Sequence, residues 1–296
     1  MLRAALRCAL ALALLCGSAA AAADIRLTDD AGRSVILQRP AQRIISLTPH
    51  LTELLFAAGA GDRIVGTVEY SNYPPAARRI ARIGDNARLD LERIVALKPD
   101  LVLVWRDGNA QRQLDKLLRL GVPVYYNESR RLPDIARAIE QLGLLAGTEA
   151  QALPAARAYT ARLEELRRRY AGGAPVTLFF QIWDRPLLSV NGEHLISDAI
   201  RLCGGRNIFA GLAPLTPELT TEAVLAADPE AIVAAGAEAG QTGDLDAWRQ
   251  WPRMRAVARG NLFLLDPDVI SRNTPRILDG AAALCADLDA ARARRR

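Results

Sequence analysis

Three aromatic residues stand where short apolar runs of the sequence end. Trp105 closes one run and is followed by Arg-Asp-Gly-Asn, a loop-type sequence, while Trp183 and Tyr70 follow two other runs. In open α/β sheets, ligands bind beyond the carboxyl ends of the strands. Because each ring can bury roughly 150 to 250 Å² of surface, these positions predict a pocket for a flat or apolar ligand.

Two histidines, His50 and His194, occupy matching places in the two halves of the chain. Each begins a His-Leu pair after the end of a predicted strand. An imidazole at such a place could ligate the metal centre of a corrinoid or a haem. It could instead cap the helix that follows or donate to a loop carbonyl, and the sequence leaves both roles open.

The sequence lacks the common catalytic signatures. It contains no Gly-x-Ser-x-Gly elbow, no His-Glu-x-x-His motif, no phosphate loop ending in Gly-Lys-Ser/Thr and no dinucleotide fingerprint. Gly59, Gly61 and Gly66 are spaced wrongly for that fingerprint and fit the end of a helix better. We therefore predict a binding protein and not an enzyme, with no cofactor and no metal site of its own.

Residues 1–23 follow the order of a secretory signal peptide. Two arginines precede an apolar run, and a tract of small residues ends at Ala23, after which we expect cleavage. The apolar run is too short to cross a bilayer, which needs about 20 residues. The sequence therefore predicts a soluble protein exported to the periplasm. Cys16, followed by a glycine, leaves a lipid-anchored N-terminus as the alternative, although the bulky Leu15 disfavours it.

The charge of the chain argues against a nucleic-acid partner. The formal net charge is +5, and removal of the two signal-peptide arginines, with no acid, lowers it to +3. The basic residues are scattered among acids in helical patterns, and the one dense run, at 292–296, has the composition of a solvated tail.

Two cysteines, Cys203 and Cys285, remain after the signal peptide is removed. An even pair in an oxidising compartment most simply forms one disulfide. No other cysteine or histidine lies at a zinc-ligand spacing from either of them.

Short apolar runs alternate with helical patterns along the mature chain. Predicted strands lie at 43–47, 64–68, 101–105, 122–126, 176–182, 231–235 and 261–265, and predicted helices at 52–58, 91–97, 110–120 and 132–145. This alternation predicts two Rossmann-like α/β lobes with largely parallel sheets.

One long amphipathic helix is predicted at 148–172, between the two sets of strands. About 20 residues rising 1.5 Å each span about 30 Å, the length of a small domain. A single backbone helix joining two lobes would act as a stiff hinge, and an ordinary core helix is the alternative. The predicted organisation is a signal peptide at 1–23, an N-terminal lobe at 24–147, the linker helix at 148–172 and a C-terminal lobe at 173–296.

The two predicted lobes share a sequence repeat. The segment at 90–103 aligns with 220–233 at an offset of 130, which matches Glu92 with Glu222, and a second pairing sets 50–61 against 194–205. Two matches in the same chain order indicate related lobes. Because ligands bind at domain interfaces, we expect the ligand cleft between them.

Several stretches resemble the helical-backbone periplasmic binding proteins, and among these the cobalamin-binding component of the vitamin importer. They are RIISLTPHLTELLFAAG at 43–59, YSNYPP at 70–75, LERIVALKPDLVLVWR at 91–106, CGGRNIF at 203–209 and SRNTPRI at 271–277. The resemblance implies a protein that captures cobalamin or a related corrinoid and delivers it to the permease subunits of an ABC importer. Cobalamin would be its cargo and not a cofactor, and we expect a monomer.

The resemblance also implies roles for individual residues. It places Tyr70 and Trp105 against the corrin, and we expect Trp183 and His50 to supplement them. The loop that would hold the ligand from the second lobe consists of Asp268, Val269, Ile270, Ser271 and Arg272. Glu92 and Glu222 would dock onto arginines of the permease, and Cys203 and Cys285 match the disulfide pair of the family.

The predicted pocket is less aromatic than those of the best-known cobalamin binders. The resemblance implies that those proteins carry tryptophans where this chain has Asn86 and Thr216. Haem or a ferric siderophore therefore stays open as the cargo. Haem would require an axial ligand, with His50, His194 or a tyrosine as candidates, whereas a siderophore would favour arginines in the cleft, such as Arg106 and Arg272.

Overall fold

The computed structural model describes residues 24–85, 88–109, 111–119, 121–236 and 243–295. The predicted signal peptide, including Cys16, and the position of Asn86 lie outside the described residues. Within the described ranges, no helix is long and apolar enough to cross a membrane.

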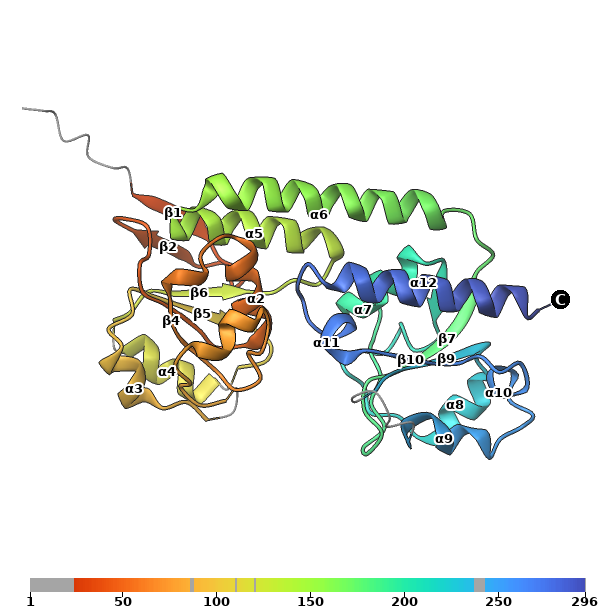
Figure 1. The fold of residues 1–296 in the computed structure, drawn as a ribbon. Coiled ribbons are helices and arrows are strands. Elements are labelled where there is room, and N and C mark those ends of the chain that lie inside the picture. Colours follow the sequence, from red (N-terminus) through yellow and green to blue (C-terminus); the bar gives the residue numbers. More distant parts are fainter. Residues whose placement is uncertain (1–23, 86–87, 110, 120, 237–242, 296) are drawn as a thin grey trace, which may run out of the picture.

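The first half of the chain is built around a parallel four-stranded sheet (Figure 1). Its strand order is β4 (Ile64–Thr67), β3 (Ile44–Ser46), β5 (Leu101–Trp105) and β6 (Val124–Asn127). Every residue of β3 and β6 is buried, which is typical of parallel strands covered on both faces. An antiparallel hairpin of β1 (Ile25–Thr28) and β2 (Ser34–Leu37) precedes the sheet.

Two of the four helices of this half begin at side-chain caps. They are α2 (Pro49–Ala57), α3 (Leu91–Ala96), α4 (Gln111–Arg119) and α5 (Leu132–Ala146), with short 3-10 turns η2 (Gly61–Arg63) and η3 (Pro75–Arg79). Thr48 caps α2 by accepting a hydrogen bond from the backbone N–H of Leu51 at 3.4 Å. Asp90 caps α3 by accepting one from Arg93 at 2.9 Å. Side-chain caps of this kind fix where each helix begins.

The second half repeats the same topology. Its parallel sheet has the order β10 (Leu262–Leu265), β9 (Ala231–Ala235), β7 (Val176–Gln181) and β8 (Gly205–Asn207). Its helices are α7 (Leu195–Leu202), α8 (Thr221–Ala227), α9 (Gly243–Arg249), α10 (Arg255–Ala258), α11 (Pro267–Ile270) and α12 (Ile277–Ala293). In each sheet the first strand lies between the second and the third, with the fourth at the edge. The prediction of two α/β lobes with parallel sheets is confirmed, and we call them the first and second lobe.

Helix α6 (Glu149–Tyr170) runs along one side of both lobes (Figure 1). Its buried side chains recur at three- and four-residue spacing and include Ala156, Tyr159 and Leu163. They belong to a hydrophobic core that also contains Leu195 and Ile277 of the second lobe. The long helix predicted between the two sets of strands is therefore present, and it packs into a core shared by the lobes.

Cys203 and Cys285 form a disulfide, as predicted. The bond joins the end of α7 to α12, and both cysteines are fully buried. Their separation in the sequence is 82 residues. In the simplest chain-entropy model, closing a loop of this size stabilises the folded state by about 4 to 5 kcal/mol.

Candidate functional site

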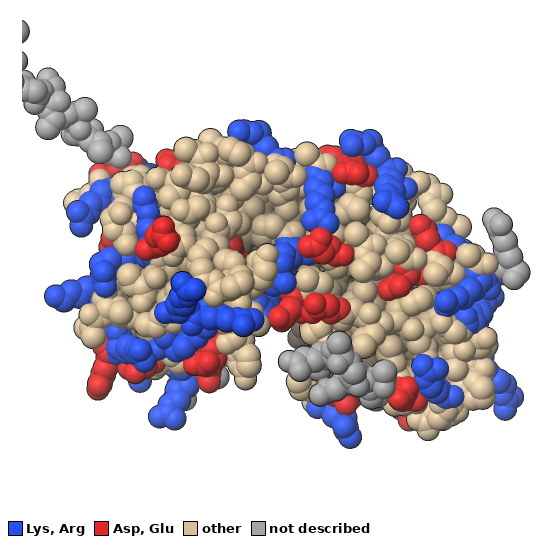
Figure 2. Space-filling model, in the orientation of Figure 1, with Lys and Arg blue, Asp and Glu red and all other residues tan. Residues whose placement is uncertain are grey.

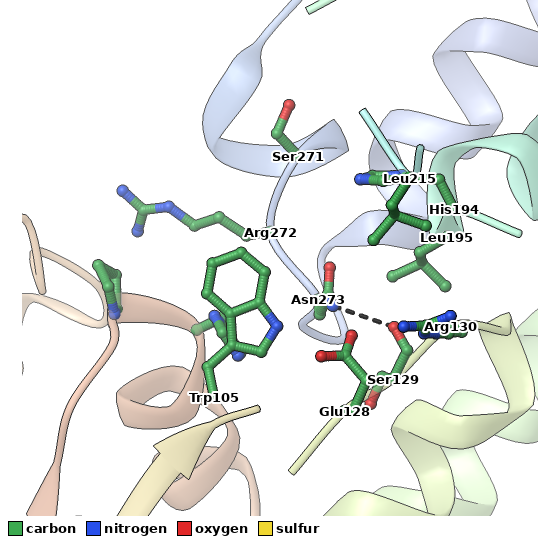
Figure 3. A pocket seen from close by; sticks show the side chains of 12 residues that line it. Trp105, Glu128, Ser129, Arg130, His194, Leu195, Leu215, Ser271, Arg272 and Asn273 are labelled. Carbon is green, nitrogen blue, oxygen red and sulfur yellow. Dashed lines mark hydrogen bonds between the residues drawn. The ribbon is translucent and has the colours of Figure 1, made fainter. Parts of the chain in front are cut away.

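Two adjoining cavities lie beyond the carboxyl ends of the first-lobe strands, and the larger of them lies between the lobes. Their volumes are about 210 and 160 Å³, and Pro49, His50 and Trp105 line both of them. The larger cavity (Figure 3) is also lined by Glu128, Ser129 and Arg130 from the first lobe and by His194, Leu195, Leu215, Ser271, Arg272 and Asn273 from the second. The cleft therefore has one wall from each lobe, as the sequence repeat predicted.

Tyr70 and Trp105 bring aromatic rings to this cleft. Trp105 is the last residue of β5, and its indole packs edge-on against His50 with 5.3 Å between the ring centres. Tyr70 lines the smaller cavity and is 78% exposed. Its φ of 63° lies in the left-handed region, which is strained for a bulky residue and is found mostly at functional sites. The backbone thus presents the Tyr70 ring to solvent at the cleft.

The loop after β5 fixes the orientation of Trp105. Asn109 accepts a hydrogen bond from the backbone N–H of Trp105 at 2.8 Å and donates one to the carbonyl of Leu47 at 3.1 Å. The indole lies directly on Gly108, where an added Cβ would fall 1.8 Å from a ring carbon. Glycine is therefore required next to the tryptophan, which gives the Arg-Asp-Gly-Asn sequence a structural role.

Both histidines line the larger cavity, and both are neutral at neutral pH. Burial, followed by the charge of Arg272, lowers the pKa of His50 to about 3. Burial, followed by the charge of Arg130, lowers the pKa of His194 to about 4. Within the described part of the chain, no three His, Cys, Asp or Glu side chains are grouped so that they could hold a metal ion.

His194 has the capping role that was one of its two predicted alternatives. Its Nδ1 accepts a hydrogen bond from the backbone N–H of Ile196 at 3.1 Å, at the start of α7. A neutral imidazole that accepts through Nδ1 carries its proton on Nε2. Neither nitrogen then has a free lone pair for a metal, so this ring is suited to donate a hydrogen bond into the cleft.

Arg272 bridges the cleft from the second lobe to the first. Its guanidinium donates to the carboxylate of Glu53 and to the side-chain oxygen of Asn72, both at 2.8 Å. Arg276 donates to the same carboxylate at 2.8 Å, and the side chain of Glu53 is only 3% exposed. Because charge-assisted hydrogen bonds are the stronger kind, this buried carboxylate is a strong polar tie between the lobes.

The four residues before Arg272 have different surroundings. Ser271 lines the larger cavity, and Asp268 accepts a hydrogen bond from Arg272 at 2.7 Å. Ile270 is fully buried in the core of the second lobe, contrary to the prediction, because α11 turns this side chain inward. Val269 is half-buried and is absent from the described walls of both cavities.

Trp183, predicted to contact the ligand, is not among the residues that line these two cavities. It follows β7 and forms an antiparallel bridge with Leu188. Its indole N–H donates to the carbonyl of Arg185 at 3.0 Å, and the residue is 60% exposed. The turn after β7 therefore holds this ring at an exposed position.

Sequence reasoning missed a polar wall that follows β6. Five buried side-chain atoms of the described residues have no hydrogen-bond partner, namely Nε1 of Trp105, Oδ1 of Asn127, Oε2 of Glu128, Oγ of Ser129 and Oγ1 of Thr274. Three of these residues line the larger cavity, and the other two are next to residues that do. Folded proteins rarely leave buried polar groups unpaired. The change from Tyr-Tyr to Asn-Glu-Ser at a strand end is the sequence signal that could have revealed this wall.

Glu128 is the charged member of the polar wall. Burial, followed by the negative charge of Asp107, raises the pKa of Glu128 to about 7. The charge of Arg130 and the nearby indole N–H of Trp105 oppose this shift, but Oε2 has no well-aligned hydrogen-bond donor among the described residues. Arg130 instead pairs with Asp107 and, at 3.3 Å, with Glu193. The carboxyl oxygen is therefore left facing the cleft (Figure 3).

Glu92 and Glu222 lie outside the cleft at equivalent positions of the two lobes. Each is the second residue of its helix, and both are exposed. Helices α3 and α8, which carry them, lie on the side of their lobes that faces away from α6 (Figure 1). The repeated topology thus gives each lobe one exposed carboxylate at the same place.

The surface around the cleft carries both signs of charge. Figure 2 shows acidic and basic side chains interspersed over this face, with a hollow between the lobes on the side away from α6. This face lacks the one-sign stripe that is the footprint of nucleic-acid binding.

Sequence comparison identifies relatives along most of the chain. A family model described as periplasmic binding protein matches residues 44–269. The vitamin B12-binding protein of Vibrio cholerae serotype O1 is 37% identical over 247 residues, which cover 83% of this chain and 88% of that protein. The vitamin B12-binding protein of Yersinia pestis is 38% identical over 245 residues, which cover 83% and 85%.

Solved structures show the same fold. The periplasmic vitamin B12 binding protein BtuF of Vibrio cholerae has a TM-score of 0.80 at 37% identity, covering 85% of this chain and 98% of that one. The periplasmic heme-binding protein RhuT from Roseiflexus sp. RS-1 has a TM-score of 0.73 at 23% identity, covering 85% and 99%, and shares the fold alone. With two equivalent lobes, a cleft between them and these relatives, the chain belongs to the periplasmic binding protein family.

Proposed function

We propose that this protein captures cobalamin in the cleft between its lobes and delivers it to the permease subunits of an ABC importer in the inner membrane. The observation that carries the proposal is the 37% identity to a vitamin B12-binding protein over 83% of the chain. The cleft supports it, because Tyr70 and Trp105 present rings against which a broad corrin face can pack.

The protein is a binding protein and not an enzyme, because it belongs to the periplasmic binding protein family. Capture and release of a ligand require no covalent step. Cobalamin is accordingly proposed as transported cargo and not as a resident cofactor.

Ligand entry requires the lobes to separate further than they do in this structure. Cavities of about 210 and 160 Å³ are smaller than the roughly 300 to 1,000 Å³ of ordinary small-molecule pockets, and cobalamin is a large ligand. The contacts that must break include those from Arg272 to Glu53 and Asn72. We infer that residues 24–147 and 173–296 move as the two lobes, with the helix at 148–172 as their stiff link.

We propose that the protein acts in the periplasm as a monomer. Residues 1–23 would direct export, and the Cys203–Cys285 disulfide suits an oxidising compartment. One chain supplies both walls of the cleft, so no second copy is needed to complete it. Mass spectrometry of the mature N-terminus distinguishes cleavage after Ala23 from lipidation at Cys16.

Glu92 and Glu222 are the proposed docking residues for the permease. Two exposed carboxylates on equivalent helices suit a symmetric basic partner. Exposed ion pairs contribute only about 0.2 to 1 kcal/mol each. Their expected effect is therefore on the orientation and rate of encounter more than on affinity.

The test is a side-by-side titration of the mature protein with cyanocobalamin and with hemin, followed by tryptophan fluorescence and the visible spectrum of the ligand. Saturable one-to-one quenching by the corrinoid alone supports the proposal. A hemin spectrum with axial ligation and no response to the corrinoid would replace it with haem import and make His50 the first residue to change. A response to a ferric siderophore alone would move the assignment to that cargo.

A further inference from the structure

Individual side-chain atoms of Glu128, Ser129 and Trp105 in the wall of the larger cavity lack a well-aligned hydrogen-bond partner among the described residues, which indicates that the ligand supplies one. We propose that Glu128, together with Ser129 and the indole N–H of Trp105, forms a subsite that recognises peripheral carboxamide groups and discriminates against the corresponding carboxylates. The subsite rests on the proposed corrinoid ligand and names the chemical feature by which the cleft selects it.

The unpaired atoms of the wall match a carboxamide in hydrogen-bonding capacity. Nε1 of Trp105 is a donor only, the ionised carboxyl of Glu128 is an acceptor, and the hydroxyl of Ser129 can do either. A primary carboxamide offers two N–H donors and one carbonyl acceptor, so it can satisfy Glu128 and Trp105 at once. A carboxylate has no donor to offer Glu128 and brings a like charge beside it.

The cations of the larger cavity are already paired with acids. Arg130 is held by Asp107 and Glu193. Arg272 is held by Glu53 and by Asp268. In the described cavity wall, a carboxylate-bearing ligand would therefore find no cation without an acidic partner.

The two cavity histidines add no positive charge. Burial lowers the pKa of both His50 and His194 far below neutrality, so both rings are neutral under the conditions of binding. They can exchange hydrogen bonds with a ligand but cannot neutralise an acid. Because the histidines are neutral and the arginines are paired, the cleft favours a ligand whose peripheral groups are polar but uncharged.

The main chain of the subsite is anchored from both lobes, which leaves its side chains for the ligand. Asp30 accepts hydrogen bonds from the backbone N–H of Glu128 at 2.7 Å and from the side chain of Asn127 at 3.2 Å. Asn273 of the second lobe donates to the carbonyl of Ser129 at 3.0 Å (Figure 3). The buried side chains of Glu128 and Ser129 are thus held at a fixed place in the cleft wall.

The experiment compares affinities for cyanocobalamin and for its separated monocarboxylic acids, in each of which one peripheral carboxamide is hydrolysed. The proteins are the wild type, Glu128→Gln and, as a matched control, Glu140→Gln at an exposed position of α5. At pH 8 the carboxyl of Glu128 is largely ionised, because its pKa is about 7. The wild type should bind cyanocobalamin about tenfold more tightly than at least one monoacid.

Glu128→Gln should lower that preference to about threefold or less, because the glutamine amide can donate to the acid. The control variant should keep the wild-type preference. Equal preferences in the wild type and Glu128→Gln, or a wild type that binds all monoacids like cyanocobalamin, would overturn the subsite while leaving cobalamin capture intact. A wild type that binds none of these corrinoids would overturn the proposed function and the subsite with it. Circular dichroism verifies that each variant is folded.

Discussion

Arg272 of the second lobe donates a hydrogen bond to the carboxylate of Glu53 in the first, with 2.8 Å between Nη1 and Oε1. Arg276 holds the same carboxylate through two further hydrogen bonds, at 2.8 and 2.9 Å. One buried acid on α2 thus ties together two arginines that stand more than 200 residues away in the sequence.

Glu53→Ala should destabilise the protein by about 3 to 5 kcal/mol, because removing one partner of a buried ion pair leaves the other charges uncompensated. Urea denaturation gives the change in free energy of unfolding. Glu140→Ala, at an exposed position, serves as the control and should change it by about 0.5 kcal/mol or less. Equal effects of the two substitutions would show that the tie contributes nothing.

Trp105→Ala should weaken cyanocobalamin binding by tenfold or more, whereas Trp183→Ala should change it by about twofold or less. Burial of one aromatic ring contributes at least about 1.5 kcal/mol, and only Trp105 lines the described cavities. Fluorescence or calorimetric titration measures both affinities. A larger loss in Trp183→Ala would mean that the ligand-bound lobes bring that ring into the cleft.

The stability of the protein should fall as the pH drops below about 6.5, through the two buried histidines. The pKa of His50 is lowered to about 3 and that of His194 to about 4, so the unfolded chain binds protons between these values and 6.5 that the folded chain does not. Each histidine contributes up to about 1.4 kcal/mol per pH unit in this window. Denaturant titrations at pH 7 and pH 5 measure the change, and His50→Gln should reduce it. An unchanged pH dependence in that variant would contradict the lowered pKa.

Replacement of both Cys203 and Cys285 by alanine should lower the free energy of unfolding by about 4 kcal/mol, because the unfolded chain regains the freedom of an 82-residue loop. Urea denaturation of the double variant and of the wild type, with and without reductant, measures the loss. The reductant should affect the wild type alone. Equal free energies of unfolding for the double variant and the oxidised wild type would contradict the stabilising role of the disulfide.

Glu92→Ala combined with Glu222→Ala should reduce uptake of labelled cobalamin by cells while leaving the affinity of the purified protein within about twofold of the wild type. Both residues are exposed and lie outside the described cavity walls. Glu140→Ala combined with Glu165→Ala, at two exposed positions of other helices, provides the control. Unimpaired uptake by the double variant would remove the docking role.

Continuous apolar runs made the central strands predictable from the sequence. The predictions at 101–105 and 231–235 agree with β5 and β9 to the residue, because short continuous apolar runs are typical of parallel strands buried on both faces. The hairpin of β1 and β2 and the three-residue strand β8 were missed. Their pairing is defined by partners elsewhere in the chain, and β8 consists of Gly-Arg-Asn, which carries no strand signal.

The residues of the candidate site were predictable only where the end of a strand determines which side chains reach the cleft. Trp105 ends a strand and Tyr70 follows one, and both line the cavities, whereas Trp183 also follows a strand but lines neither, because its indole N–H is held by the turn after β7. Glu53 and Glu128 were missed for a different reason. Their importance comes from a partner 219 residues away in the first case and from burial without a partner in the second, and neither property is visible in local sequence.

The disulfide between α7 and α12 also determines how the second lobe can move. One of the joined helices begins next to His194 and the other next to Arg276, so the bond links the two segments that flank the second-lobe wall of the cleft. Neither segment can swing independently when the lobes close. We therefore expect the second-lobe wall of the cleft to move as one rigid unit, so that its contacts with a ligand form and break together.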